Sequence, residues 1–302
     1  MSGRPAPDEA EILAFQAECD RFYPPDAVSA SVSQQRAWYD ALCRTFDTPH
    51  PPGISVEDAP VAGVPTRRYR PQAARPGAPV VLYLHGGGFV VGSLDSHDGI
   101  CADLAEAAGL ELLAADYRLL PEHPYPAARR DAFSVLAHLV ERGARVVLAG
   151  DSAGGTLAAG LAIEARDRGL GGIVGQVLVY PGLGGDLTSG SFVEMAEAPG
   201  LTTADVAYYR ELQGVPAGDV LAHPLNAADL AGLPPAFISA AHFDPLRDDG
   251  RNYARRLIEA GVCVTYREEP QMVHGWLRAR RRSPGAKAGF SRLCEALRSF
   301  AD

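Results

Sequence analysis

Lysine is nearly absent from this 302-residue sequence: a single lysine, Lys287, stands among 28 basic residues. A nucleotide-binding P-loop ends in Gly-Lys-Ser/Thr, whereas Lys287 lies between two alanines, so a Walker-type site is excluded. Acidic residues outnumber basic ones, and the formal net charge is -9. Because nucleic-acid binding needs a basic surface, we expect no nucleic-acid partner.

Cysteines and long apolar runs are scarce too. The five cysteines are odd in number and scattered, without a Cys-x-x-Cys pair, a pattern that argues against zinc or redox chemistry and favours a reduced, cytoplasmic protein. No run reaches about 18 apolar residues, and the acidic N-terminal segment lacks the apolar core of a signal peptide. We therefore expect neither secretion nor membrane association.

Short apolar runs alternate with helical patterns along most of the chain. Each run is bounded by Gly or Pro and is continuously apolar, which is typical of strands buried on both faces. This alternation predicts an α/β fold, a mostly parallel, doubly wound sheet with helices on both faces. The predicted strands are 80–84, 112–115, 146–149, 174–180, 236–241 and 262–266, with 54–61 and 64–69 as antiparallel edge strands; the helices between them are 99–108, 127–142, 155–168, 247–260 and 285–300.

Two segments lie outside this alternation. Residues 1–50 contain two helical patterns, 9–22 and 33–46, separated by Pro24-Pro25, and residues 182–232 are rich in turn residues around one helical pattern at 203–212. A 50-residue excursion within a domain usually serves function, so we interpret both segments as a cap over the carboxyl ends of the strands. The chain then divides into cap helices (1–50), a first core part (51–181), a cap insertion (182–232) and a second core part (233–302).

The strongest chemical signal is Gly150-Asp151-Ser152-Ala153-Gly154, placed between a predicted strand and a predicted helix. A nucleophile elbow needs this arrangement, because glycines two residues before and after the Ser relieve crowding where strand meets helix. The N-terminus of the following helix favours negative charge developing near the Ser oxygen. We interpret Ser152 as a nucleophile rather than an incidental turn residue.

A second glycine-rich segment, His85-Gly86-Gly87-Gly88-Phe89, follows an earlier predicted strand. Consecutive glycines let backbone N–H groups turn toward an oxyanion. The alternatives are a flexible loop and a Rossmann-type phosphate loop, and the second fails because Val91 occupies the position of its last glycine. We interpret His85 as a residue that orients this loop.

A nucleophilic Ser on such an elbow needs an acid and a His from the ends of later strands. His274, in the predicted loop Met272-Val273-His274-Gly275, meets this requirement, and Asp244 stands at the turn that leaves the preceding strand. Asp248 is the alternative acid, although a carboxylate in the first turn of a helix commonly only balances the helix dipole. His242 ends its strand one strand too early, and its role stays open.

These segments resemble the hormone-sensitive-lipase-like (bacterial family IV) esterases of the Gly-Asp-Ser-Ala-Gly subgroup. The matching pieces are His85–Phe89, Asp116-Tyr117-Arg118-Leu119 with Pro121-Glu122-His123-Pro124, Gly150–Gly155, Asp244–Asp248 and His274-Gly275, in the order of that family. The resemblance implies an α/β-hydrolase fold with an N-terminal helical cap and a triad of Ser152, Asp244 and His274. It also implies an oxyanion hole formed by the N–H groups of Gly87, Gly88 and Ala153, with His85, Gly86 and Asp151 in support.

We therefore predict a serine carboxylesterase that hydrolyses short- to medium-chain esters, small-molecule substrates, through an acyl-enzyme intermediate and without a metal or organic cofactor. The alternatives are an amidase or lactonase with the same triad, and a non-catalytic small-molecule receptor on the same fold.

Three further expectations concern the surroundings of the site. The Arg278–Arg282 segment, with four arginines in five positions, reads as a solvated surface turn in preference to an anion site. The family resemblance suggests a homodimer formed through residues 286–300. The pocket is expected to draw on aromatic residues, namely Phe22, Tyr23, Trp38, Phe89, Tyr208 and Tyr209.

Overall fold

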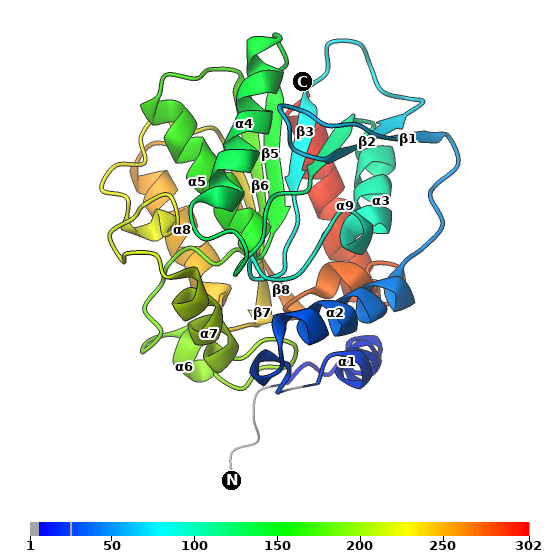
Figure 1. The fold of residues 1–302 in the computed structure, drawn as a ribbon, viewed down its shortest axis with the longest axis vertical. Helices are drawn as coiled ribbons and strands as arrows, with labels where there is room; N and C mark the ends of the chain where they lie inside the picture. Colours follow the sequence, from blue (N-terminus) through cyan, green and yellow to red (C-terminus); the bar gives the residue numbers. More distant parts are fainter. Residues whose placement is uncertain (1–5, 25, 302) are drawn as a thin grey trace.

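The computed structural model describes residues 6–24 and 26–301 and is built on an eight-stranded sheet of order β1-β2-β4-β3-β5-β6-β7-β8 (Figure 1). The strands from β3 to β8 pair in parallel, and β1 and β2 form an antiparallel edge, so the predicted fold class is confirmed. The strands are Ile54–Asp58 (β1), Thr66–Pro71 (β2), Val80–Leu84 (β3), Leu112–Ala115 (β4), Val146–Asp151 (β5), Ile173–Val179 (β6), Ala236–Phe243 (β7) and Val264–Val273 (β8).

Helices cover both faces of the sheet. Helices α3 (Asp98–Ala108) and α9 (Pro284–Ser299) lie on one face, and α4 (Ala127–Glu141), α5 (Ala153–Asp167) and α8 (Arg247–Glu259) lie on the other (Figure 1). Successive residues of β3 alternate between the two cores: Val81 and Tyr83 pack with α3 and α9, whereas Leu82 and Leu84 pack with α4, α5 and α8. Burial on both faces explains why β3 is continuously apolar.

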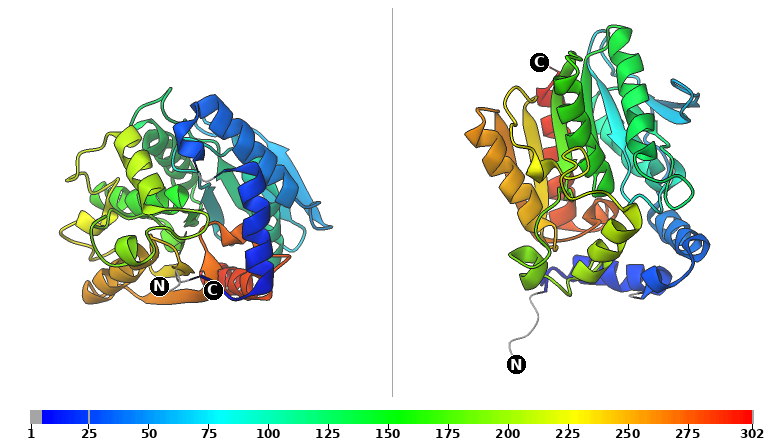
Figure 2. Two further views of the ribbon diagram at one scale, coloured as in Figure 1. Left: turned by 90° about the horizontal axis from the view of Figure 1, so that it is seen from below. Right: turned by 60° about the vertical axis from the view of Figure 1, so that its left-hand side comes forward.

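The remaining helices lie together across the end of the sheet where the parallel strands finish (Figures 1 and 2). They are α1 (Ala10–Phe22), α2 (Val32–Phe46), α6 (Ser191–Glu194) and α7 (Thr203–Gln213). The helical patterns predicted in residues 1–50 and 182–232 are therefore present at this end. Of the predicted break at Pro24-Pro25, only Pro24 lies within the described residues.

The predicted end of the last strand is wrong. β8 continues from Val264 to Val273, so Met272 and Val273 belong to a strand and not to a loop. β8 is an edge strand with one exposed side, and the charged residues Arg267, Glu268 and Glu269 interrupt its apolar pattern. An alternating strand of this kind is less visible in the sequence than a fully buried one. Among the described residues, no helix is long and apolar enough to cross a membrane.

Candidate active site

Ser152 occupies a sharp turn between β5 and α5, with φ 53° and ψ -121°. This backbone conformation is strained for a non-glycine residue, and a strained turn of this kind is typical of a nucleophile elbow. Neighbouring glycines make the turn possible: a Cβ on Gly154 would lie 1.9 Å from the Leu84 carbonyl oxygen, and one on Gly150 would lie 2.5 Å from the Gly154 backbone. Both positions therefore require glycine for lack of space.

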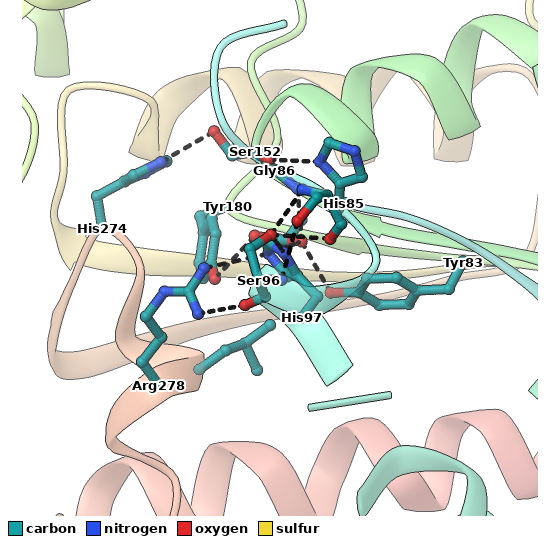
Figure 3. Close-up of polar contacts among 12 residues, drawn as sticks. Tyr83, His85, Gly86, Ser96, His97, Ser152, Tyr180, His274 and Arg278 are labelled. Carbon is teal, nitrogen blue, oxygen red and sulfur yellow. Dashed lines mark hydrogen bonds and ion pairs between the residues drawn. The ribbon is translucent and has the colours of Figure 1, made fainter. Parts of the chain in front are cut away.

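Three side chains form a continuous hydrogen-bonded chain at this turn. His274 Nε2 lies 2.9 Å from Ser152 Oγ, and His274 Nδ1 lies 2.7 Å from Asp244 Oδ2 (Figure 3 shows the Ser152–His274 contact). Asp244 is fully buried, and its other carboxylate oxygen accepts the Leu246 N–H at 2.8 Å. A carboxylate that accepts from Nδ1–H leaves Nε2 free to accept the Ser152 hydroxyl proton.

Asp248, the alternative acid, makes other contacts. Its Oδ2 accepts the Ser191 N–H at 2.9 Å, and its Oδ1 pairs with Arg251 at 3.0 Å. His242 is also engaged elsewhere, with Nδ1 2.6 Å from Glu268 Oε1. Asp244 and His274 are therefore the residues that the fold connects to Ser152, whereas Asp248 and His242 have other partners.

The glycine loop after β3 lies beside the elbow. Gly87 and Gly88 have φ values of 125° and 60°, which favour glycine, and a Cβ on Gly87 would lie 2.1 Å from the Val91 carbonyl oxygen. The Tyr209 ring of α7 packs on Gly88, where a Cβ would lie 2.6 Å from it. Ala153 is the first residue of α5, so its N–H lacks an acceptor within the helix. All three predicted donors line the same pocket as Ser152.

Asp151 links this loop to the elbow from behind. Its carboxylate accepts hydrogen bonds from the Tyr83 hydroxyl at 2.8 Å and from the Gly86 N–H at 3.0 Å, and His97 Nε2 lies 3.4 Å away. Burial alone would raise the pKa of Asp151, but His97, Tyr83 and Arg278 outweigh it and hold that pKa below its ordinary value. Asp151 thus remains a carboxylate that fixes the start of the glycine loop.

His85 lies against the same loop and is buried. Its Nδ1 is 2.8 Å from the Gly86 carbonyl oxygen, and its ring stacks on Tyr117 at a centroid distance of 4.3 Å. Burial lowers the pKa of His85 to about 3, so the imidazole is neutral at pH 7 and donates its Nδ1–H to Gly86. These contacts orient the loop, and the ring lies on the side of Ser152 opposite His274 (Figure 3).

The Arg278–Arg282 segment is only partly a solvated turn, so that prediction is wrong for Arg278 and Arg280. Arg280 is 4% exposed and pairs with Asp103 at 2.7 Å, and Arg281 pairs with the same carboxylate. Arg282 pairs with Glu18. Arg278 points inward, with one guanidinium nitrogen 2.8 Å from the Ser96 carbonyl oxygen and the other 2.9 Å from the Tyr39 hydroxyl. Arg278 and Arg280 turn inward to partners from distant parts of the chain, whereas Arg281 and Arg282 remain exposed.

A pocket of about 420 Å³ opens over Ser152 and His274. Of the predicted aromatic residues, Tyr23, Phe89 and Tyr209 are among its lining residues, whereas Phe22, Trp38 and Tyr208 are not. Sequence reasoning missed several lining residues because no local motif marks them; they are Phe15, Gln16, Leu42, His97, Ile100, Tyr180, Arg210, His223 and Arg278.

Comparison with known proteins places the chain among hydrolases. Residues 81–278 match the model of a family described as having the alpha/beta hydrolase fold. Esterase LipI of Mycobacterium tuberculosis is 42% identical over 257 residues, which cover 80% of this chain and 79% of the relative. The ethyl acetate hydrolase of Pseudomonas putida is 36% identical over 247 residues, covering 78% of each chain.

Solved structures agree with the sequence comparison. An esterase from the bacterial hormone-sensitive lipase family superposes with a TM-score of 0.89 at 30% identity, covering 97% of this chain and 98% of that one. The resemblance drawn from the motifs is thereby confirmed at the level of the family. Over most of its length, in sequence and in fold, the chain belongs to the α/β-hydrolase family that contains the hormone-sensitive-lipase-like esterases.

Proposed function

We propose that this protein is a serine carboxylesterase in which Ser152, His274 and Asp244 act as nucleophile, general base and orienting acid. The observation that carries the proposal is the hydrogen-bonded chain from Ser152 through His274 to Asp244, at a strained turn that faces a pocket. Relatives at 36–42% identity are named as esterases, carboxylesterases and carboxylic ester hydrolases, which supports carboxylic esters as the substrate class.

The proposed reaction begins when His274 Nε2 takes the Ser152 proton and Oγ attacks the ester carbonyl carbon. The carbonyl oxygen becomes an oxyanion that accepts hydrogen bonds from the N–H groups of Gly87, Gly88 and Ala153. The imidazolium then protonates the leaving alcohol. His274 next activates water, which attacks the acyl-enzyme, and the carboxylic acid leaves as Ser152 regains its proton.

Asp244 holds His274 in the required tautomer and stabilises the imidazolium. The buried carboxylate supports this role because two donors, His274 Nδ1–H and the Leu246 N–H, hold its oxygens in place. The Tyr180 ring packs against the His274 ring at a centroid distance of 4.7 Å and restricts its rotation.

The pocket supports short- to medium-chain acyl groups. A volume of about 420 Å³ lies within the ordinary range for small-molecule sites, which is roughly 300–1,000 Å³. The Tyr209 ring packs on Gly88 and narrows the space beside the proposed oxyanion hole. We also propose a cytoplasmic location, which the five free cysteines support.

A fluorophosphonate probe and a 4-nitrophenyl butyrate assay test the proposal together. We expect the probe to label wild-type protein at Ser152, and we expect Ser152→Ala to lose both labelling and nearly all turnover. Circular dichroism of the variant serves as the folding control. A folded Ser152→Ala protein that hydrolyses the ester at the wild-type rate would refute the assignment.

A further inference from the structure

Arg278 differs from the other arginines of its segment in having no acidic partner. Arg280 and Arg281 pair with Asp103, and Arg282 pairs with Glu18. Within the described part of the chain, no carboxylate oxygen lies within 4.0 Å of the Arg278 guanidinium. Its polar contacts are with the Ser96 main-chain carbonyl, the Tyr39 hydroxyl and, at 3.5 Å, His97 Nε2. The one arginine of this segment that lines the pocket is therefore the one without a carboxylate in direct contact, although Asp151 attracts it from beyond ion-pair distance.

The surroundings hold the Arg278 guanidinium in a fixed place. It lies over the Tyr39 ring, 5.2 Å from the centroid, and is tied to Ser96 in η2 (Asp95–His97). Figure 3 shows the side chain on the same side of the site as His274 and Tyr180, turned toward Ser96 and His97. An arginine held on a ring face is a preorganised receptor for a planar anion, because little side-chain entropy remains to be lost on binding.

Apolar side chains line the same pocket on the side of α1, α2 and α3. Phe15, Leu42 and Ile100 are buried there and pack in the same core cluster as Leu277, the neighbour of Arg278. A half-buried cation beside apolar walls is costly unless an anion compensates it. This combination suits an aliphatic chain that ends in a carboxylate.

The nearby acidic residues meet this need only in part. Asp151 also lines the pocket and attracts Arg278, but it does so from beyond ion-pair distance, and its carboxylate accepts hydrogen bonds from Tyr83 and Gly86. Asp20 and Glu197 line the pocket as well, and both are exposed. Asp205, the fourth acidic residue of the lining, accepts hydrogen bonds from the Thr202 N–H and hydroxyl. None of these four residues forms a close ion pair with Arg278, and a ligand carboxylate that reaches Arg278 would form one.

We propose that Arg278 forms an anion subsite in this pocket and that the enzyme favours esters carrying a carboxylate at the far end of a short aliphatic chain. The proposal rests on the esterase function above and narrows its substrate class to half-esters of dicarboxylic acids and esters of hydroxy acids. Hydrogen bonds to charged groups are roughly twice as strong as neutral ones, so one such contact discriminates between otherwise similar esters.

Two matched substrate pairs test the subsite. Monoethyl glutarate against ethyl pentanoate places the charge on the acyl side, and 4-acetoxybutanoate against butyl acetate places it on the alcohol side. In at least one pair we expect the ratio of kcat/KM, charged over neutral, to fall about tenfold or more in Arg278→Met, with Arg278→Lys between the two. Arg282→Met removes a charge from the same segment outside the pocket, and we expect it to keep the wild-type ratio.

A binding experiment separates this proposal from the esterase function. We expect glutarate to bind Ser152→Ala protein in calorimetry and to bind at least tenfold more weakly when Arg278→Met is added. Thermal unfolding of each variant shows whether the substitution changes stability. Because the charged-to-neutral ratio compares two substrates on the same protein, a general loss of activity cancels in it. Unchanged ratios in both pairs, together with equal glutarate affinity, would overturn the subsite while leaving the esterase intact. If the esterase assignment alone were wrong, glutarate binding would still depend on Arg278, but ester hydrolysis would not depend on Ser152.

Discussion

Substitution of Gly154 by alanine tests how the elbow and the glycine loop are joined. The new Cβ would lie 1.9 Å from the Leu84 carbonyl oxygen and 2.7 Å from the His85 carbonyl oxygen. Both contacts are with backbone, so no side chain can rotate to make room. Relief requires α5 and the end of β3 to move apart by roughly 1.5 Å before ordinary van der Waals contact is restored.

The size of this shift sets the expected loss. Overpacking of a well-packed core typically costs about 1–3 kcal/mol of unfolding free energy. The same displacement separates Ser152 from the glycine loop, and a misplacement of about 1 Å at a reacting centre can reduce the rate about 100-fold. We therefore expect Gly154→Ala to lower both the thermal midpoint and the kcat for 4-nitrophenyl butyrate, with kcat falling about 100-fold.

Gly171→Ala is the matched control, because a Cβ there meets no atom within 4 Å. We expect this control to keep wild-type activity and stability. The decisive comparison is kcat measured well below the thermal midpoint of each protein. If Gly154→Ala retained the kcat of the Gly171→Ala control, the elbow and the loop would not be held by this contact, and the reasoning would be refuted.

Three other predictions follow from the site and its support. Asp244→Asn preserves the shape of the triad but favours the wrong His274 tautomer, so kcat should fall by about 10⁴-fold in a stopped assay, and a fall below tenfold would contradict the role given to Asp244. Asp103→Asn leaves the buried Arg280 without its carboxylate and should cost about 3 kcal/mol in urea unfolding, whereas equal midpoints would show that the pair contributes nothing. Burial lowers the pKa of His85 to about 3 from 6.5, so as pH falls the unfolded chain takes up this proton before the folded protein does. The free energy of unfolding should therefore fall as pH drops from 6.5 toward 3, and the fall should be smaller in His85→Gln. Parallel curves of stability against pH for the two proteins would contradict this role of His85.

The sequence predicted the central strands and the nucleophile with good accuracy because their signals are local. β3 and β4 have the predicted bounds, since burial on both faces makes each a continuous apolar run between polar or glycine residues. Ser152 was identified because the elbow needs glycines on both sides, and those glycines are required by contacts with nearby backbone. Asp244 and His274 followed from their order along the chain.

The pocket and the arginine segment could not be predicted in this way. Arg278 is held by Ser96 and Tyr39, which are 182 and 239 residues away along the chain. No pattern within residues 278–282 indicates such distant partners. From the sequence alone, a run of charged residues is therefore predicted to be solvated surface. For the same reason Tyr209 and Tyr208, adjacent in sequence, separate into a pocket residue and a residue that is not among its lining.

The meeting of Asp244 and His274 depends on an irregularity between β7 and β8. Ala241 is paired with Glu269, but after the bulge Phe243 is paired with Val273, so two extra residues of β8 are accommodated there. Asp244 and His274 directly follow Phe243 and Val273, the last residues of β7 and β8, so the two side chains leave the sheet next to each other. Under the earlier register Asp244 would emerge beside Met272, and the acid would miss the imidazole. His242 lies within this irregularity, and its Nδ1 is 2.6 Å from Glu268 Oε1 of β8, so this contact joins the two strands beside the shifted pairing.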